Sequence, residues 1–323
     1  MDLIFCGTPE FAVPTLNALV KAGHHVQLVV SQPDRPSGRG QQLAIPAVKL
    51  RALELGLPVA QPAAIKNNED FRAQLEALKP RAIVVVAYGR IIPKWMLELA
   101  PLGNINLHAS LLPKYRGAAP IQWALANGER VTGATTMRLN EGLDTGPILL
   151  QAEISIGGDE TAAEVSLRLA KSGAELMSET LRQLEAGTLQ PRAQDDSQAT
   201  LAPVLKKEDG RINFSLPAQA IYNRLRGFQP WPGAFTSFRG KQLQISEARP
   251  SPADDLSLHG RDARATQALP PGKIRVVDQR LMAGCGQDTI LELLELQPEG
   301  KRRISVAEFI NGYRPQGGEQ LGS

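Results

Sequence analysis

The chain has 323 residues with a formal net charge of +3, and 42% of its residues are hydrophobic. At about 100–200 residues per domain, this length predicts two domains or one large one, and the balanced charge excludes a disordered chain. No apolar run reaches the ~18 residues that span a bilayer, and the first residues carry no basic leader. The two cysteines, Cys6 and Cys285, form no metal-type pair. We therefore expect a soluble protein of the reducing cytoplasm, without membrane contact and without a disulfide framework.

The positive charge is concentrated in the last third of the chain. Residues 1–205 carry a net charge of −1, and residues 206–323 carry a net charge of +4. A basic bias of this size fits a polyanionic partner, and it fits an ordinary surface no less well. Charge alone therefore selects no function.

Short β-branched runs alternate with helical patterns in the first half of the chain. Gly23 follows one helical pattern as a stop signal, and Asn67 or Asn68 can cap another helix. The run 82–87 is apolar at every position, which is typical of a parallel strand covered on both faces. This alternation predicts a doubly wound α/β domain whose ligands bind at the carboxyl ends of the strands. The first strands are expected at 3–6, 25–31 and 82–87, and the first helices at 10–22, at 46–55 and up to residue 78.

The sequence pattern changes after a long predicted helix at 161–186, which ends at Gly187. Residues 188–208 are polar, contain proline and show no periodicity, which indicates a linker. Beyond them, many short strands punctuated by Gly and Pro predict a small β-barrel or sandwich. The strand candidates are 234–238, 242–248, 272–277, 280–283 and 289–296, and helical patterns lie near 217–226 and 306–311.

Two common nucleotide-binding signatures are absent from the chain. The turn Gly7-Thr8-Pro9 lacks the G-x-G-x-x-G pattern, and no G-x-x-x-x-G-K-[ST] occurs. These absences disfavour NAD enzymes and P-loop NTPases. The Gly/Pro-rich loop 32–43 carries Arg35 and Arg39. It suits phosphate capture beside an active site, and it equally suits a mobile surface loop.

Polar residues alternate with apolar ones at 104–108. In a strand Asn104, Asn106 and His108 share one face. An unpaired polar group inside a doubly covered sheet costs about 1–3 kcal/mol, so these side chains need either partners or a ligand. A structural histidine with asparagine partners is the alternative to a functional site.

Asp144 precedes a Thr-Gly turn and has an ordinary Asx-turn role as its alternative. With Asn106 and His108 it offers a coherent chemistry. An asparagine can donate to a developing oxyanion, a histidine can move a proton near neutral pH, and a carboxylate can orient the imidazole. This trio suits acyl or formyl transfer to an amine, and it requires no serine or cysteine nucleophile because the amine itself attacks.

Several motifs follow one another in a fixed order along the chain. They are FCGTPEF at 5–11, QPDRP at 32–36 with GRG at 38–40, VVAYG at 85–89, N-x-H-x-S-L-L-P-x-Y-R-G-A-A-P-I at 106–121 and LDTG at 143–146. In these motifs the chain resembles the methionyl-tRNA formyltransferase family. The loop with QPDRP and GRG, together with the second domain and its FQPWP at 228–232, narrows the resemblance to enzymes acting on tRNA. Ala109 and Tyr115 stand where glycine and tryptophan are common in that family. We assign no function to the polar stretch 252–266.

The resemblance implies both an architecture and a reaction. It implies an α/β, Rossmann-like doubly wound formyltransferase domain and a small OB-like β-barrel that binds tRNA. The boundaries expected are 1–187 for the catalytic domain, 188–208 for the linker, 209–315 for the barrel and 316–323 for a tail. In the implied reaction, 10-formyltetrahydrofolate gives its formyl group to the methionine amine of initiator methionyl-tRNA for translation initiation. We expect a monomer that uses neither metal nor NAD.

The resemblance also assigns roles to single residues. His108 handles the proton of the amine, Asp144 orients or polarises the base, and Asn106 hydrogen-bonds the carbonyl oxygen as it becomes tetrahedral. Folate binding is implied for Tyr88, Gly89, Ile91, Ser110, Leu111, Leu112, Pro113, Leu139 and Gly142. Binding of tRNA is implied for Arg35, Arg39, Lys206 and Lys207.

Other functions remain open on the residues themselves. A formyltransferase acting on an amino-sugar nucleotide or another small amine, or a formyl-folate hydrolase, would use the same trio. The loop 32–43 and the C-terminal domain favour tRNA over these small substrates. A nucleotide-dependent oxidoreductase is disfavoured by the missing glycine motif, and a non-catalytic RNA-binding protein leaves the trio unexplained.

Overall fold

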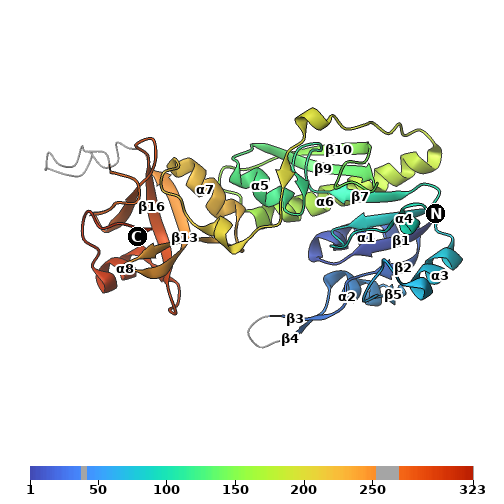
Figure 1. The fold of residues 1–323 in the computed structure, drawn as a ribbon, viewed down its shortest axis with the longest axis horizontal. Helices are drawn as coiled ribbons and strands as arrows, with labels where there is room; N and C mark the ends of the chain where they lie inside the picture. The colour runs from blue at the N-terminus through green and yellow to red at the C-terminus, as the bar shows by residue number, and fades with distance from the viewer. Residues whose placement is uncertain (38–41, 252–268, 323) are drawn as a thin grey trace. The chain divides into compact units, whose positions relative to one another are not determined.

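The computed structural model describes residues 1–37, 42–251 and 269–322 (Figure 1). Arg39 and the stretch 252–266 lie outside the described residues. The chain divides into two compact units. The first comprises residues 1–121, 131–155 and 164–203, and the second comprises residues 122–130, 156–163 and 204–323.

The first unit is built on a seven-stranded sheet with the order β10-β9-β7-β6-β1-β2-β5. Five strands from β7 to β5 run parallel to their neighbours, and β9 and β10 continue the sheet antiparallel. This is the predicted α/β class, with an antiparallel extension next to β7. The strands are β1 (Asp2–Gly7), β2 (His25–Val30), β5 (Val59–Ala60), β6 (Ala82–Val86), β7 (Asn104–His108), β9 (Val131–Arg138) and β10 (Ile148–Ser155).

Helices of the first unit follow the predicted pattern with small shifts at their ends. Asn68 caps α3 because its side chain accepts a hydrogen bond from Phe71 N at 3.0 Å. The pattern at 10–22 begins as a 3₁₀ turn and continues as α1, and Gly23 follows it with φ 77°. The elements are η1 (Glu10–Ala12), α1 (Val13–Lys21), α2 (Ala47–Glu54), α3 (Glu69–Leu78), α4 (Lys94–Leu97) and α6 (Ala162–Ala186). Helix α5 (Pro120–Ala126) begins in the first unit and continues into the second, which contains residues 122–130.

Two short pairings lie outside this alternation. Residues expected to form only a loop include the hairpin β3 (Arg35–Ser37) and β4 (Gln42–Ala44). Near the site, β8 (Arg116–Gly117) pairs in parallel with β11 (Leu201–Ala202). The chain therefore stays with the first unit after α6, up to residue 203, before it enters the second.

The two faces of the sheet bury different sets of side chains. Ile83 and Val85 of β6 pack in a cluster with Phe71 and Leu75 of α3. On β9, Thr136 Oγ1 lies 2.8 Å from Thr180 Oγ1 of α6, so α6 covers this part of the sheet (Figure 1). The carboxyl ends of β6 and β7 open at the same edge, which is where a doubly wound sheet binds its ligands.

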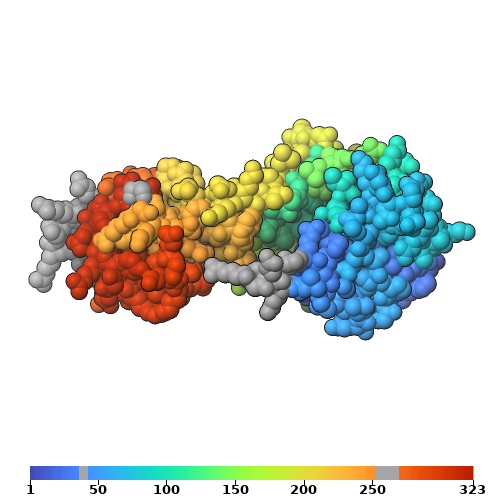
Figure 2. Space-filling model, turned by 60° about the horizontal axis from the view of Figure 1, so that its bottom comes forward, coloured from blue at the N-terminus to red at the C-terminus, as the bar shows by residue number. Residues whose placement is uncertain are grey.

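The second unit contains an antiparallel sheet with the order β12-β13-β16-β15-β14, and β17 also pairs with β16. Gly322 N donates to Ser237 O of β12, and Leu321 N donates to Gly272 O beside β14. The C-terminal residues thus join both edges, and the described strands close into a small barrel, as predicted. Figure 2 shows part of its surface in orange and red. The elements are α7 (Ala218–Gly227), β12 (Ala234–Phe238), β13 (Lys241–Ser251), β14 (Ile274–Val277), β15 (Arg280–Gly284), β16 (Ile290–Pro298), β17 (Ile304–Ser305) and α8 (Val306–Tyr313).

The barrel buries its apolar residues with the period of a strand. Leu291 and Leu293 of β16 lie in one core cluster with Phe309 of α8. Between them Glu292 points to the other side, where it is 3% exposed and pairs with Arg280 and Arg249 at 2.8 and 2.7 Å. No helix in the described part of the chain is long and apolar enough to cross a membrane.

Candidate active site

The polar side chains of β7 fall into two groups, one that takes part in packing and one that lies near the open carboxyl end of the strand. Asn104 Nδ2 donates to the carbonyls of Met96 and Leu97 at 2.9 and 3.2 Å, so this amide belongs to the packing of α4. The strand period places Asn106 and His108 on the same face, nearer to the open carboxyl end. Asn106 is half-buried, and no described residue shares a hydrogen bond with its carboxamide. Its donor therefore remains available to a ligand.

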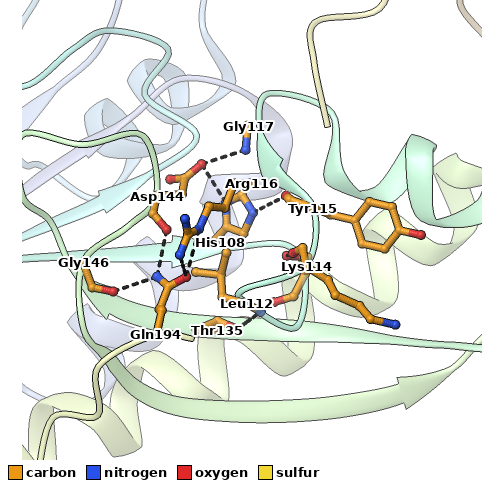
Figure 3. Close-up of polar contacts among 11 residues, drawn as sticks. His108, Leu112, Lys114, Tyr115, Arg116, Gly117, Thr135, Asp144, Gly146 and Gln194 are labelled. Carbon is orange, nitrogen blue, oxygen red and sulfur yellow. Dashed lines mark hydrogen bonds and ion pairs between the residues drawn. The ribbon is translucent and has the colours of Figure 1, made fainter. Parts of the chain in front are cut away.

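His108 is held by two contacts and is 6% exposed. Its Nε2 lies 2.9 Å from the Tyr115 carbonyl oxygen, and its Nδ1 lies 3.7 Å from Asp144 Oδ2 (Figure 3). A carbonyl oxygen only accepts, so Nε2 carries the hydrogen of this bond. The nitrogen that can gain or lose a proton is then Nδ1, which faces the carboxylate of Asp144.

Asp144 occupies a turn in the left-handed region, with φ 51°. Its Oδ2 accepts a hydrogen bond from Gly117 N at 2.9 Å, and its side chain is 13% exposed. Its backbone carbonyl accepts from Gln194 Nε2 at 2.8 Å. Gly117 therefore holds the Asp144 carboxylate near His108, and Gln194 holds the backbone of Asp144.

The loop that supplies Tyr115 and Gly117 is fixed by hydrogen bonds to and from three hydroxyl groups. Thr135 Oγ1 donates to Ser110 O at 2.6 Å and accepts from Leu112 N at 3.1 Å. Ser110 Oγ donates to Lys114 O at 2.6 Å, and Tyr115 N donates to Thr200 Oγ1 at 2.8 Å. These bonds set the positions of the backbone groups that contact His108 and Asp144 (Figure 3).

The residues expected near a folate lie on two neighbouring loops. Gly89, with φ 79°, and Ile91 follow β6, and the Ile91 side chain is 93% exposed. Gly142 is exposed on the loop before Asp144, where its N–H donates to Asn140 Oδ1 at 3.1 Å. An ion pair of 3.7 Å between Lys94 and Glu141 joins the two segments.

The other residues expected to bind folate are mostly buried. The Tyr88 ring is 2% exposed in the core cluster of β6, and burial raises the pKa of its hydroxyl group. Leu112 and Leu139 pack in one cluster with Met137. Ser110 is also buried, whereas Leu111 and Pro113 are half-buried. The exposed apolar surface of the site is therefore on the loops rather than on these side chains.

The expected tRNA contacts fall on both units. Arg35 is exposed on β3 in the first unit, and Lys206 and Lys207 are exposed at the start of a 3₁₀ turn in the second. No group of three His, Cys, Asp or Glu side chains in the described ranges could hold a metal ion.

Three side chains near the site were not selected from the sequence. Gln32 Nε2 donates to the carbonyls of Tyr88 and Gly89 at 3.0 and 3.1 Å. Arg116 lies in the Y-R-G part of the motif at 106–121, and the concentration of motif residues there is a signal that could have selected it. Gln194 lies in the aperiodic stretch predicted as a linker, where no sequence pattern pointed to it.

Family models match both units of the chain. The formyl transferase model matches residues 1–181, and the model of the formyl transferase C-terminal domain matches residues 204–314. The fold and the site thus define an enzyme of the formyl transferase class.

Similar proteins extend over the full length. The methionyl-tRNA formyltransferase of Koribacter versatilis is 58% identical over 100% of this chain and 99% of its own. That of Acidobacterium capsulatum is 60% identical over 97% of this chain and 96% of its own. The chain belongs to the methionyl-tRNA formyltransferase family.

Solved structures share the fold at low identity. The sugar 3N-formyl transferase WlaRD, described in the presence of dTDP and 5-N-formyl-THF, is 16% identical with a TM-score of 0.64, over 94% of this chain and 99% of its own. An N-formyltransferase from Helicobacter canadensis, in complex with folinic acid and dTDP-3-aminofucose, is 18% identical with a TM-score of 0.65, over 92% and 98%. These likenesses support the fold alone.

Proposed function

We propose that this chain transfers the formyl group of 10-formyltetrahydrofolate to the α-amino group of methionine on initiator methionyl-tRNA. The observation that carries the proposal is His108, held between the Tyr115 carbonyl and the Asp144 carboxylate. The family of the chain supports the same reaction. Asn106, His108 and Asp144 are the proposed catalytic residues.

Proton transfer is the first task of this site. An ammonium has no lone pair, so the amine must lose a proton to attack the formyl carbon. Nε2 of His108 already donates to the Tyr115 carbonyl, which leaves Nδ1 as the acceptor. The Asp144 carboxylate, 3.7 Å from Nδ1, stabilises the imidazolium that forms. General acid–base help of this kind contributes about 10²–10⁴-fold to the rate.

The formyl oxygen becomes negative when the amine adds to the formyl carbon. Asn106 donates its free N–H to this oxygen, and one such donor contributes about 10²–10³-fold. The bond between the formyl carbon and N10 of the folate then breaks, and the carbonyl re-forms. The attacking nitrogen gives its second proton to solvent, and the leaving N10 takes up the proton held by His108, so His108 returns to its starting state.

A folate fits the loops that follow β6 and precede Asp144. Ile91 and Leu143 are 93% and 65% exposed there, and apolar side chains of this kind suit an aromatic ring system. Gly89, in the left-handed region, brings the backbone close without a Cβ atom. The residues expected from the sequence at 110–113, 139 and 142 form the surrounding wall in this proposal.

Binding of tRNA is proposed for Arg35 and Arg39 in the loop and for Lys206 and Lys207 before the barrel. The net charge of +4 over residues 206–323 supports this proposal. Replacing both lysines by alanine should raise KM for tRNA, lower its dependence on salt and leave KM for the folate unchanged. Arg182→Ala, on the exposed face of α6, is the matched control. An equal rise in KM for the control would contradict the assignment.

The proposed division of labour follows the boundaries expected from the sequence. Residues 1–187 carry catalysis, 188–208 connect the parts, 209–315 hold tRNA and 316–323 form the tail. We propose that the enzyme acts as a monomer in the cytoplasm. Light scattering on the purified chain tests the first statement, and a single species at 34.9 kDa is the expected result.

The function is tested with three acceptors and one donor. Purified enzyme and 10-formyltetrahydrofolate are given charged initiator tRNA, charged elongator methionyl-tRNA or an amino-sugar nucleotide. Rapid formylation of the initiator, with at least tenfold lower kcat/KM for the others, is the expected result. Preference for the amino-sugar nucleotide would overturn the proposed acceptor and retain the chemistry.

A further inference from the structure

Gln194 lies outside the strands that carry the proposed catalytic residues, and it contacts the turn that carries one of them. Its Nε2 donates to the carbonyl oxygens of Asp144 and Gly146 at 2.8 and 2.7 Å (Figure 3). These carbonyls belong to the peptide groups that follow Asp144 and Gly146, with Thr145 between the two residues. Both hydrogens of one amide group therefore hold this short turn.

Arg116 fixes the orientation of that amide. Its Nε and Nη2 atoms lie 3.0 and 2.7 Å from Gln194 Oε1, and its Nη2 also contacts Asp196 Oδ1 at 2.7 Å. A guanidinium only donates, so Oε1 must face Arg116 and the amide hydrogens must face the two carbonyls. Arg116 is 7% exposed, and buried charged hydrogen bonds of this kind hold a side chain in one geometry.

The turn needs such a partner because Asp144 adopts a left-handed backbone. Its φ of 51° is a conformation that costs a residue with a Cβ atom about 1–2 kcal/mol. The carboxylate itself is held by Gly117 N at 2.9 Å and stands 3.7 Å from His108 Nδ1. A turn that relaxed would move the carboxylate away from the histidine.

We infer that Gln194 is a positioning residue for the reaction, which sets the place of the Asp144 carboxylate relative to His108 Nδ1. The inference rests on the proposed catalytic role of Asp144. Gln194 touches neither substrate in this account and acts through Asp144 alone. Its replacement therefore lowers kcat and leaves the binding of folate and tRNA unchanged.

Two substitutions test this inference. Gln194→Ala removes the amide, and Gln194→Glu keeps the size of the side chain but replaces its donors by a carboxylate. Both should lower kcat by about 10–100-fold, with KM for either substrate within threefold of wild type. Gln198→Ala is the control, since its side chain is exposed and its amide donates to Asp195 Oδ2 at 2.8 Å and to no other group in the described part of the chain. It should retain wild-type kcat. If the alanine variant does not fold, the glutamate variant carries the test.

The decisive readout is the same substitution in an Asp144→Ala background. A residue that acts only through Asp144 has nothing left to position there, so Gln194→Ala should lower kcat by less than twofold more. A further loss equal to that in the wild-type background overturns the inference. So does a normal kcat for both single variants of Gln194 when Asp144→Ala is slow. Full activity of Asp144→Ala is a different outcome, because it removes Asp144 from the proposed mechanism itself.

Discussion

The charge of Asp144 is the part of the site whose effect can be worked out from the structure. Asp144→Asn removes one charge and retains an oxygen that can accept from Gly117 N. Nδ1 of His108 lies 3.7 Å from the carboxylate, and the two side chains are 6% and 13% exposed. At an effective dielectric constant of about 20, two unit charges at this distance attract by about 4 kcal/mol.

This attraction is the upper limit of the stabilisation that the imidazolium loses. One factor of ten in rate corresponds to about 1.4 kcal/mol, so kcat should fall by about 10²–10³-fold. KM for both substrates should change little, since the substitution alters the charge and not the shape. Single-turnover formylation of methionyl-tRNA at saturating substrates measures the effect.

The matched control is another aspartate in a left-handed turn. Asp278 has φ 48° in the turn between β14 and β15 of the barrel. Asp278→Asn should retain wild-type turnover, because asparagine also adopts this conformation readily. A turnover of Asp144→Asn within fivefold of wild type, in a folded protein, would refute the electrostatic role given to Asp144.

Three further results are expected. Gly117→Ala should lower the melting temperature, and it should lower kcat at least tenfold. Gly117 has φ 126°, and a Cβ atom there would lie 2.6 Å from the backbone oxygen of Ala202 in β11. Unchanged values would contradict the packing of β8 on β11. Hydrogen bonds from Arg280, which has the larger effect, and from Arg249 hold the pKa of the Glu292 carboxyl low. The stability that Glu292 contributes is therefore present above its pKa in the unfolded chain and is lost as the pH falls through its pKa in the folded protein. Glu292→Gln should therefore lower the free energy of unfolding by about 3 kcal/mol at pH 7 in urea titrations, and the difference should shrink below about pH 4; a constant difference at both pH values would exclude this origin. Burial raises the pKa of the Cys6 thiol, and it raises the pKa of the Cys285 thiol to about 12. Iodoacetamide at pH 8 should therefore label neither thiol in the native protein, as followed by mass spectrometry; rapid native labelling would disprove their burial.

Regular periodicity explains why the main elements were predictable. The apolar run predicted as a strand at 82–87 contains β6 (Ala82–Val86), in which each residue is buried because a central parallel strand is covered on both faces. Asn68 was predicted as a cap and accepts from the amide three residues later. The short strands after residue 230 form the predicted barrel.

The direction of a side chain was harder to predict where the backbone leaves its regular geometry. Strand alternation would place Tyr88 on the face of Val84 and Val86. Ala87 has φ 46°, and this left-handed residue turns Tyr88 into the cluster of Ile83 and Val85 instead. The sequence carries no signal for such a turn at an alanine, since that conformation favours glycine.

The contacts that hold the site involve backbone groups and an aperiodic segment. His108 is held by the carbonyl of Tyr115, and Asp144 by the amide of Gly117, and every residue offers such groups. Gln194 lies where neither periodicity nor a motif marks a contact. The sequence therefore predicts the side chains of the candidate site, whereas the groups that hold two of them in place became visible only in the structure.

In the proposed reaction, His108 takes the proton of the amine during formyl transfer. Single-turnover formylation of initiator methionyl-tRNA, with wild type against His108→Ala at saturating 10-formyltetrahydrofolate, measures this role. We expect a rate at least about 10²-fold lower for the variant, with both substrates still bound. A folded His108→Ala enzyme that forms N-formylmethionyl-tRNA within a few-fold of the wild-type rate would contradict it.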